Sequence, residues 1–215
     1  MRRACGYVTL LLCASLSACS TVSGGGGAGT LLKPTTAPSA AAGGTDLAGA
    51  ALEPADVSGL AAAKTAGRPE VEAARSGCAP LAYALSGAAV GDPAATVVRR
   101  LSGEGVTVTT VLAEYRPGEA LAAMDAIGTA LDECADGFTA TVDGDGREVG
   151  DVVPELAPEG TDQAMGWGAS VRSARKSVPV KSVVLRVGDK LAYLSGTPTL
   201  PAAAIEAQTA KLSTS

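Results

Sequence analysis

The 215-residue sequence contains no histidine. This absence excludes catalytic arrangements in which histidine activates a serine or cysteine nucleophile, and it removes the commonest protein ligand of transition metals. Aromatic residues make up only 3% of the chain, so the core must be built from small side chains that each bury a modest apolar area. We expect no enzymatic activity, no cofactor and no bound metal.

The chain also lacks an excess of positive charge. Its 17 basic and 22 acidic residues give a formal net charge of −5. Residues 1–18 contain two arginines and no acid, so a chain that begins at residue 19 carries 15 minus 22, or −7. We do not expect nucleic-acid binding, because it depends on basic surfaces that neutralise phosphates.

Long apolar segments are missing too. The apolar run that ends at Leu16 has about half of the roughly 20 residues that a membrane-spanning helix needs. It follows Arg2 and Arg3 and leads into Leu16-Ser17-Ala18-Cys19, where small residues precede a cysteine and a leucine lies three positions before it. These features are typical of a lipoprotein signal peptide. We predict that residues 1–18 are removed and that the lipidated Cys19 anchors the protein on the extracytoplasmic side of the cell membrane.

Other interpretations of this end stay open. The apolar run could form a transmembrane helix, or it could be an ordinary cleaved signal peptide in which Cys19 is not modified. The Arg2-Arg3 pair suggests twin-arginine export, but the usual flanking pattern is missing, so the Sec route is the simpler interpretation.

After Cys19 the composition changes. Residues up to 45 are nearly all serine, threonine, glycine, alanine and proline, with four consecutive glycines at positions 24–27. Such a segment cannot bury enough apolar surface to offset the entropy lost on ordering. We predict a flexible tether over residues 19–45, with a reach of roughly 25–30 Å, and a folded domain over residues 46–215.

The five cysteines divide into three groups. Cys5 and Cys13 lie in the leader and Cys19 is the lipidation site, which leaves Cys78 and Cys134 in the domain. Two thiols in an oxidising compartment are expected to form a disulfide. Closing this loop would stabilise the fold by up to about 4 kcal/mol. The alternative is two buried free cysteines.

The hydrophobic pattern predicts several helices. Asp46 starts a short helix through Leu52, and Pro80 lies in the first turn of another that runs to Leu85. The clearest helix follows Pro117 and places Cys134 on its buried face. A last helix starts near Thr199 and Pro201 and has one side made of Ala204, Ile205, Gln208 and Leu212.

Strand-like runs fill most of the remaining domain. Residues 96–101 and 106–112 form a predicted hairpin, and residues 138–142 and 149–153 form a second around residues 143–146. Further strands are expected at 163–171, 180–187 and 191–195, the last two joined by a turn at Gly188-Asp189. Within 106–112 the apolar alternation changes phase, which predicts a bulge or a strand covered on both faces. The fold class is therefore α+β, with an antiparallel sheet and packed helices.

These segments, in this order, resemble the PknH-like extracytoplasmic sensor domain of actinobacterial receptor-type serine/threonine kinases and of lipoproteins that carry this domain alone. The resemblance spans residues 46–213. The similar features are Cys78-x-Pro80-Leu81, the helix from Ala120 to Cys134 followed by Phe138, the strand start Asp162-x-Ala164, and Val183-Val184-Leu185-Arg186-Val187-Gly188.

The resemblance implies two layers, an antiparallel sheet with helices packed on it, and a cleft that binds an extracellular ligand. It implies no catalytic residues, and it supports the pairing of Cys78 with Cys134. The chain departs from the kinases because it offers one disulfide where their domain has two, and because it has no kinase domain. A signal would therefore have to pass through a partner.

Three residues are candidate ligand contacts. Trp167, the single tryptophan, lies between two glycines and could stack on a sugar of a cell-wall ligand. Arg172 and Arg175, together with Lys176, could meet an anionic wall polymer or lipid head groups. The alternatives are a tryptophan that fills the core and a solvated basic loop.

The acidic residues do not form a convincing site. Asp143-Gly144-Asp145-Gly146 has Arg147 where a calcium loop needs a third ligand, so a hairpin turn explains it. Pairs such as Asp132 with Glu133, or Glu148 with Asp151, could in principle serve glycoside cleavage, which needs two acids at a defined separation. Sequence neighbours on a helix point in different directions, however, and acids are common on surfaces. Our leading hypothesis is therefore a lipid-anchored surface lipoprotein with a non-catalytic domain that binds a cell-wall or small-molecule ligand. An envelope accessory factor that binds a protein partner, and a hydrolase, are the alternatives.

Overall fold

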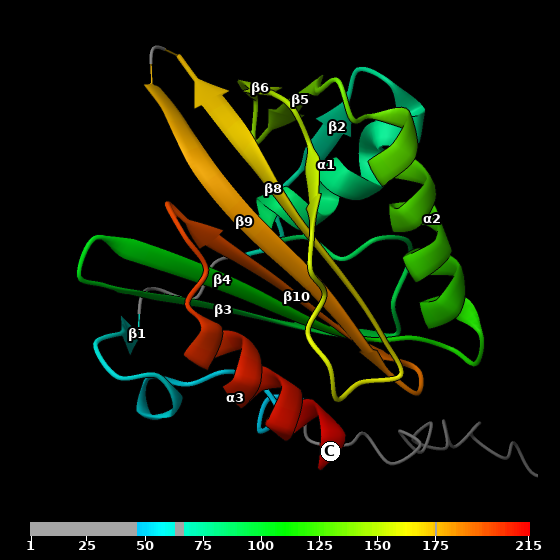
Figure 1. Ribbon diagram of the computed structural model, residues 1–215. Coiled ribbons are helices and arrows are strands. Elements are labelled where there is room, and N and C mark those ends of the chain that lie inside the picture. The colour runs from blue at the N-terminus through cyan, green and yellow to red at the C-terminus, as the bar shows by residue number, and fades with distance from the viewer. Residues whose placement is uncertain (1–46, 63–66, 175) are drawn as a thin grey trace, which may run out of the picture. The chain divides into compact units, whose positions relative to one another are not determined.

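The computed structural model describes residues 47–62, 67–174 and 176–215 (Figure 1). The predicted signal peptide, Cys19 and the tether lie outside the described residues. The described part is α+β, as predicted, with a ten-stranded antiparallel sheet and three α-helices. The strands follow the order β1-β3-β4-β10-β9-β8-β6-β5-β2, and β7 pairs with β8 beside this path.

The helices are α1 (Ala79–Ser86), α2 (Glu119–Glu133) and α3 (Ala202–Ser213), with single 3-10 turns at η1 (Pro54–Asp56) and η2 (Ser76–Cys78). The strands are β1 (Ala61–Ala62), β2 (Val71–Ala73), β3 (Ala95–Gly103), β4 (Val106–Glu114), β5 (Phe138–Val142), β6 (Asp145–Val149), β7 (Val153–Glu155), β8 (Gln163–Ser173), β9 (Lys176–Val187) and β10 (Lys190–Thr197). Within the described ranges, no helix is both long and apolar enough to cross a membrane.

Helices cover both faces of the sheet, which corrects the expected two layers to three (Figure 1). A first core cluster packs α1 and α2 against one face, and a second packs α3 and residues 47–57 against the other. Central strands bury side chains on both faces because successive residues point to opposite sides. In β4, Val111 belongs to the first cluster and Leu112 to the second.

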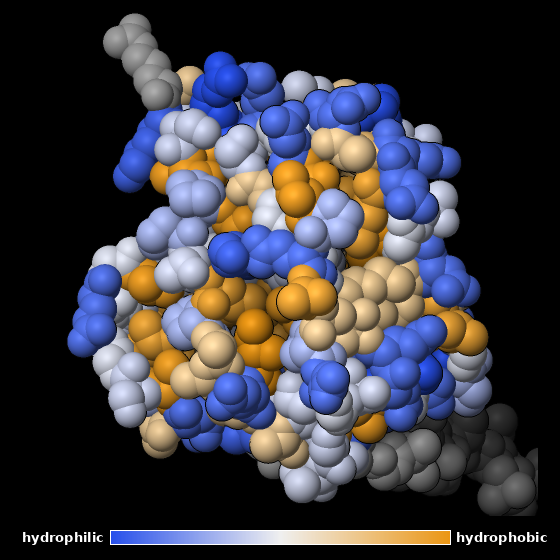
Figure 2. Space-filling view, in the orientation of Figure 1, coloured by the Kyte–Doolittle hydropathy of each residue, from blue (hydrophilic) through white to orange (hydrophobic). Residues whose placement is uncertain are grey.

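The strand β4 explains the phase change in the sequence pattern. It pairs without interruption with β3 on one side and with β10 on the other, so it contains no bulge. Its apolar residues change phase because both of its faces are covered. Figure 2 shows the surface on the α3 side, where apolar side chains (orange) lie between hydrophilic ones.

Three sequence predictions need correction. The second hairpin returns at Asp145, not at Val149, because Asp143 (φ 51°) and Gly144 (φ 83°) alone form its turn. Two residues of the expected basic loop belong to paired strands instead, with Arg172 in β8 and Lys176 in β9. Residues 47–51 form turns that lead to η1 instead of a regular helix.

Candidate functional site

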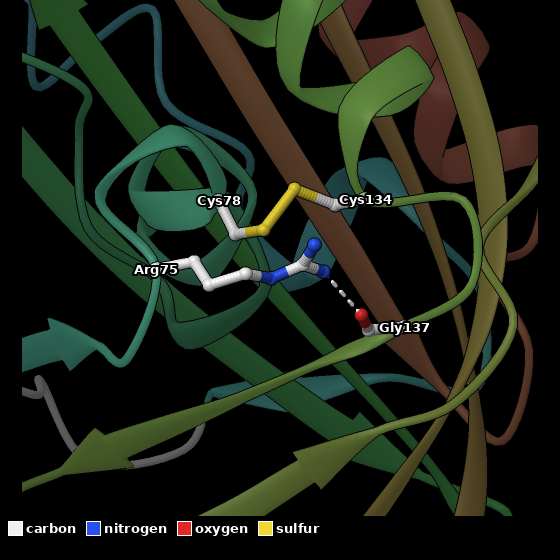
Figure 3. Close-up of a disulfide and its surroundings, with 4 residues drawn as sticks. All are labelled: Arg75, Cys78, Cys134 and Gly137. Carbon is white, nitrogen blue, oxygen red and sulfur yellow. Dashed lines mark hydrogen bonds between the residues drawn. A yellow bond between two sulfur atoms is a disulfide. The ribbon is translucent and has the colours of Figure 1, made fainter. Parts of the chain in front are cut away.

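A disulfide fixes the two helices of the first layer to each other. Cys78 lies directly before α1 and Cys134 directly after α2, and both are buried (Figure 3). The predicted pairing is confirmed, and it joins positions 56 residues apart. Beside it, the Arg75 guanidinium donates a hydrogen bond to the Gly137 carbonyl at 2.6 Å. The start of α1 and the segment after α2 are therefore held at one point.

Helix α1 ends against the sheet at Gly87. This residue has φ +79° and closes the helix by donating its N–H to the Tyr83 carbonyl. A Cβ at this position would lie 2.9 Å from Cγ2 of Thr109 in β4, so glycine permits both the left-handed turn and the close approach. The end of α1 is thus fixed over the sheet, and it forms one wall of a cleft.

This cleft has a volume of about 560 Å³ and is lined by α1, β3, β4, β5, β6, β8 and the loop before β2. We call it the arginine cleft, because its described lining includes Arg68, Arg100 and Arg147. Asp143 is the one carboxylate in that described lining. Apolar side chains make up most of the rest: Ala82, Leu85, Val98, Ala140, Val142, Val149 and Val171.

The charges of the three arginines are poorly neutralised by the described residues. Arg68 and Arg100 form no ion pair there; Arg68 donates to the Gly91 carbonyl and Arg100 to Oγ1 of Thr109, each at 3.4 Å. Arg147 reaches Asp145 at only 3.9 Å, and its Nε is shielded from solvent without an acceptor. The cleft therefore combines an apolar wall with guanidinium groups that have spare donors.

A pair of tyrosines fixes the loop whose Gly91 carbonyl accepts the hydrogen bond from Arg68. Tyr115 donates to the Val90 carbonyl at 2.7 Å and lies 2.7 Å from the Tyr193 hydroxyl, which accepts from the Val90 N–H at 3.3 Å. Because the Tyr115 proton points to Val90, Tyr193 donates to Tyr115. Burial raises the pKa of Tyr115 to about 12, although the hydrogen bond from Tyr193 opposes the rise. Gly91, the acceptor for Arg68, directly follows this fixed residue.

The predicted ligand contacts do not form one site. Trp167 is fully buried in the first core cluster, in agreement with the alternative that it fills the core. Arg172 is exposed and pairs with Glu148 at 3.3 Å, beside a shallow groove of about 510 Å³. Trp167 and Arg172 point to opposite faces of β8, because an even number of residues lies between them. Arg175 lies outside the described residues.

The acidic candidates remain apart from the cleft, except Asp143. Its Oδ1 accepts the Glu70 N–H at 2.9 Å, and its own N–H donates to the Glu70 carbonyl at 2.9 Å, so this carboxylate fixes the loop before β2. Asp132, Glu133, Glu148 and Asp151 are exposed. Within the described parts of the chain, no group of three or more acidic or cysteine side chains could hold a metal ion.

Sequence reasoning missed the arginine cleft. Arg68, Arg100 and Arg147 come from a loop, from β3 and from β6, and four strands separate β3 from β6 in the sheet order. The alternation in β3 could have shown that Arg100 and Val98 share a face. No local signal could have placed Arg147 opposite them.

No family model and no curated protein matches the chain. Among solved structures, it is similar to the extracellular domain of PknH from Mycobacterium tuberculosis, with 11% sequence identity, a TM-score of 0.50, and coverage of 75% of this chain and 88% of that one. A putative uncharacterized protein from Mycobacterium smegmatis matches at 14% identity over 73% and 89% of the two chains, with a TM-score of 0.41. The match to PknH confirms the resemblance at the level of the fold: this chain has the fold of the PknH extracellular domain.

Proposed function

We propose that the protein is a lipid-anchored lipoprotein of the cell surface whose folded domain binds a ligand in the arginine cleft without catalysis. The cleft itself carries this proposal. Its volume of about 560 Å³ falls in the range of roughly 300–1,000 Å³ that small-molecule sites occupy, and it combines apolar walls with a few convergent polar groups. The β-strands and the disulfide-fixed α1 form a stable frame around it.

Two observations support a position outside the cytoplasm. The Cys78–Cys134 disulfide fits an oxidising compartment, because cytosolic thiols are normally kept reduced. The sequence up to Cys19 has the features of a lipoprotein signal. The fold, which an extracellular domain shares, agrees with both.

The chemistry of the cleft favours binding over catalysis. Histidine is absent from the chain, and the single carboxylate of the described lining, Asp143, already accepts a backbone hydrogen bond. General acid–base catalysis requires a proton donor or acceptor near the reacting atom with a matched pKa. Guanidinium groups remain protonated and act as binding groups.

A second candidate function is an envelope accessory factor that binds a protein partner. One observation favours it: Leu156, between β7 and β8, is 99% exposed, and Val153 in β7 is 57% exposed. Exposed apolar surface can mark a site of protein contact. Leu156→Ser would weaken such a contact and leave ligand binding in the cleft unchanged.

A thermal-shift screen of the full chain tests the proposed cleft. We would screen cell-wall fragments, small metabolites, and anionic and neutral amphiphiles. A ligand at 100 times its Kd stabilises the folded state by about 2.7 kcal/mol, which raises Tm by roughly 5–10 °C for a domain of this size.

Two tryptophan substitutions locate the binding. Ser86→Trp places a large side chain in the cleft from the end of α1, whereas Thr129→Trp adds the same side chain on the exposed surface of α2. The shift should disappear in Ser86→Trp and persist in Thr129→Trp. A panel without any shift, or a shift that Ser86→Trp leaves intact, would contradict the proposal.

A further inference from the structure

The arginine cleft also indicates which chemical class of ligand it takes. Building on the proposed function, we infer that the ligand is a single-chain anionic amphiphile, with a phosphate or carboxylate head group held by Arg68, Arg100 and Arg147 and an alkyl chain that lies along the apolar wall. The arginines alone would fit any anion, and the apolar wall alone would fit any apolar molecule. Because both line one cavity, they indicate a ligand that is anionic and apolar at once.

The charge distribution is the first argument. The chain is acidic overall, with a net charge of −5, yet the described lining of the cleft holds three arginines and one carboxylate. Outside the cleft, Arg116, Lys181 and Lys211 lie within 3.0 Å of a carboxylate, whereas among the described residues Arg75 and Lys190 donate only to uncharged oxygens. The cleft differs because three weakly paired arginines converge in one cavity. A cavity that concentrates poorly neutralised guanidinium groups in an acidic protein attracts anions and repels cations.

The donors of Arg147 and Arg100 are the second argument. Nε of Arg147 is buried without an acceptor, and its ion pair with the exposed Asp145 is long, at 3.9 Å. Arg100 uses its Nε in a weak 3.4 Å hydrogen bond to Thr109. The remaining fork-shaped donors match the paired oxygens of a phosphate or carboxylate. Arg68, on the loop before β2, adds a third charge.

The apolar wall is the third argument. Leu85, Val98 and Val171 are only partly buried although they pack on the first core cluster, so they leave apolar surface in the cleft. An inorganic anion would leave this surface in contact with water. An alkyl chain would cover it, and each methylene buried in this way raises affinity about fourfold.

Calorimetric titration of the full chain tests the inference, with Cys19→Ser introduced so that no attached lipid competes for the cleft. The probes are dodecyl phosphate, decyl phosphate, inorganic phosphate and dodecyl maltoside, each below its micelle concentration. We expect one dodecyl phosphate per chain. Decyl phosphate should bind about 15-fold more weakly because it lacks two methylenes, and inorganic phosphate and dodecyl maltoside at least tenfold more weakly.

Matched variants identify the groups that bind the anion. Arg100→Gln and Arg147→Gln should each weaken dodecyl phosphate binding about tenfold. Arg99→Gln is the control, because Arg99 is the neighbouring residue in β3 and points to the other face, outside the lining. Arg147→Lys keeps the charge without the fork and should lose less than Arg147→Gln. Without any substitution in the cleft, dodecyl phosphate should also bind more weakly as the NaCl concentration rises from 0.05 to 0.5 M.

The outcomes separate this inference from the proposed function. If dodecyl maltoside binds as tightly as dodecyl phosphate, or if Arg100→Gln and Arg147→Gln behave like Arg99→Gln, the anionic assignment is wrong while a ligand cleft remains. If inorganic phosphate binds as tightly as dodecyl phosphate, the inference that an alkyl chain lies along the apolar wall is wrong. If Ser86→Trp leaves dodecyl phosphate binding unchanged, the amphiphile binds elsewhere and the inference fails. A different compound that shifts Tm and is blocked by Ser86→Trp would support the proposed function alone.

Discussion

Gln208 joins two parts of the chain that are far apart in sequence. This fully buried side chain in α3 accepts a hydrogen bond from the Leu52 N–H at 3.1 Å and donates one to the Ala50 carbonyl at 2.8 Å. Lys211 in the same helix pairs with Asp56 at 2.6 Å. The sequence pattern places Gln208 on the buried side of the last helix, where a polar residue needs partners. The structure supplies them from the segment before η1.

We expect Gln208→Leu to lower the free energy of unfolding by about 2–4 kcal/mol, because it leaves a buried N–H and a buried carbonyl without partners. Urea unfolding, followed by the fluorescence of the buried Trp167, measures the change. Glu206→Ala, an exposed substitution in α3, should stay within about 0.5 kcal/mol of the unmodified protein. Equal stability of the Gln208→Leu and unmodified proteins would show that this amide does not hold the segment.

Because of Tyr115, the stability of the domain should depend on pH in the alkaline range. Its folded pKa of about 12 lies above the ordinary value of 10.0, mainly because of burial, so the neutral form is favoured in the folded state. The stability that this preference provides is complete below pH 10 and is lost as the pH rises toward 12. The advantage of the unmodified protein over Tyr115→Phe should therefore shrink across this window.

At pH 7, Tyr115→Phe should lower the free energy of unfolding by about 1–2 kcal/mol, because the Val90 carbonyl loses its donor. Urea unfolding at pH 8 and pH 11 compares the two proteins. Tyr83→Phe, at a partly exposed position in α1, is the control and should change stability by less than about 0.5 kcal/mol at either pH. A difference between the Tyr115→Phe and unmodified proteins that stays constant from pH 8 to pH 11 would rule out the titration.

At the scale of elements, α1 depends on its connections. It has eight residues, too few for a helix that is stable alone. Pro80 in its first turn, the disulfide at its start and Gly87 at its end compensate for this length. The same helix contributes Ala82, Leu85 and Ser86 to the arginine cleft, so its anchoring affects the site directly.

Replacing Cys78 and Cys134 together by alanine should lower the free energy of unfolding by up to about 4 kcal/mol, because the unfolded chain loses a crosslink that closes a long loop. Reductant should lower the Tm of the unmodified domain toward that of the double variant and leave the double variant unchanged. The affinity of the cleft should fall in both cases. A double variant with the original Tm would mean that packing alone holds α1 on α2.

The sequence predicted long, regular elements well. The helix after Pro117, the hairpin of β3 and β4, and the turn at Gly188-Asp189 all follow from local periodicity and turn chemistry. The short strands β1, β2 and β7 have two or three residues each, and pairing with neighbours defines them rather than local preference. The third layer was missed because the packing of residues 47–57 on the sheet is a long-range contact.

The site was less predictable than the fold, for a related reason. The sequence drew attention to Arg172, Arg175 and Lys176 because these residues are close along the chain. The structure instead brings Arg100 and Arg147 to one cavity across a sheet in which four strands separate β3 from β6. Charges that are close only in space leave no local pattern, so a site of this kind becomes visible only once the strand order is known.

At the scale of the whole molecule, the two core clusters share the central strands β4, β9 and β10. Loss of either cluster would expose one face of strands that the other cluster needs, so we expect both to unfold together. The first described residue, Leu47, packs in the second cluster. We therefore expect cooperative unfolding of the described domain, in which its first described residue takes part.

If the lipid is attached to the Cys19 thiol, as we propose, Cys19→Ala should abolish labelling by a fatty-acid probe. The variant should also be released from the membrane fraction or remain misprocessed. Cys13→Ala is the matched control: it lies in the segment that is removed, so the mature protein should keep its label. If the Cys19→Ala protein still carries the label, another residue is modified. If the unmodified protein keeps residues 1–18 and its Cys78 and Cys134 thiols are reduced, the protein is not exported.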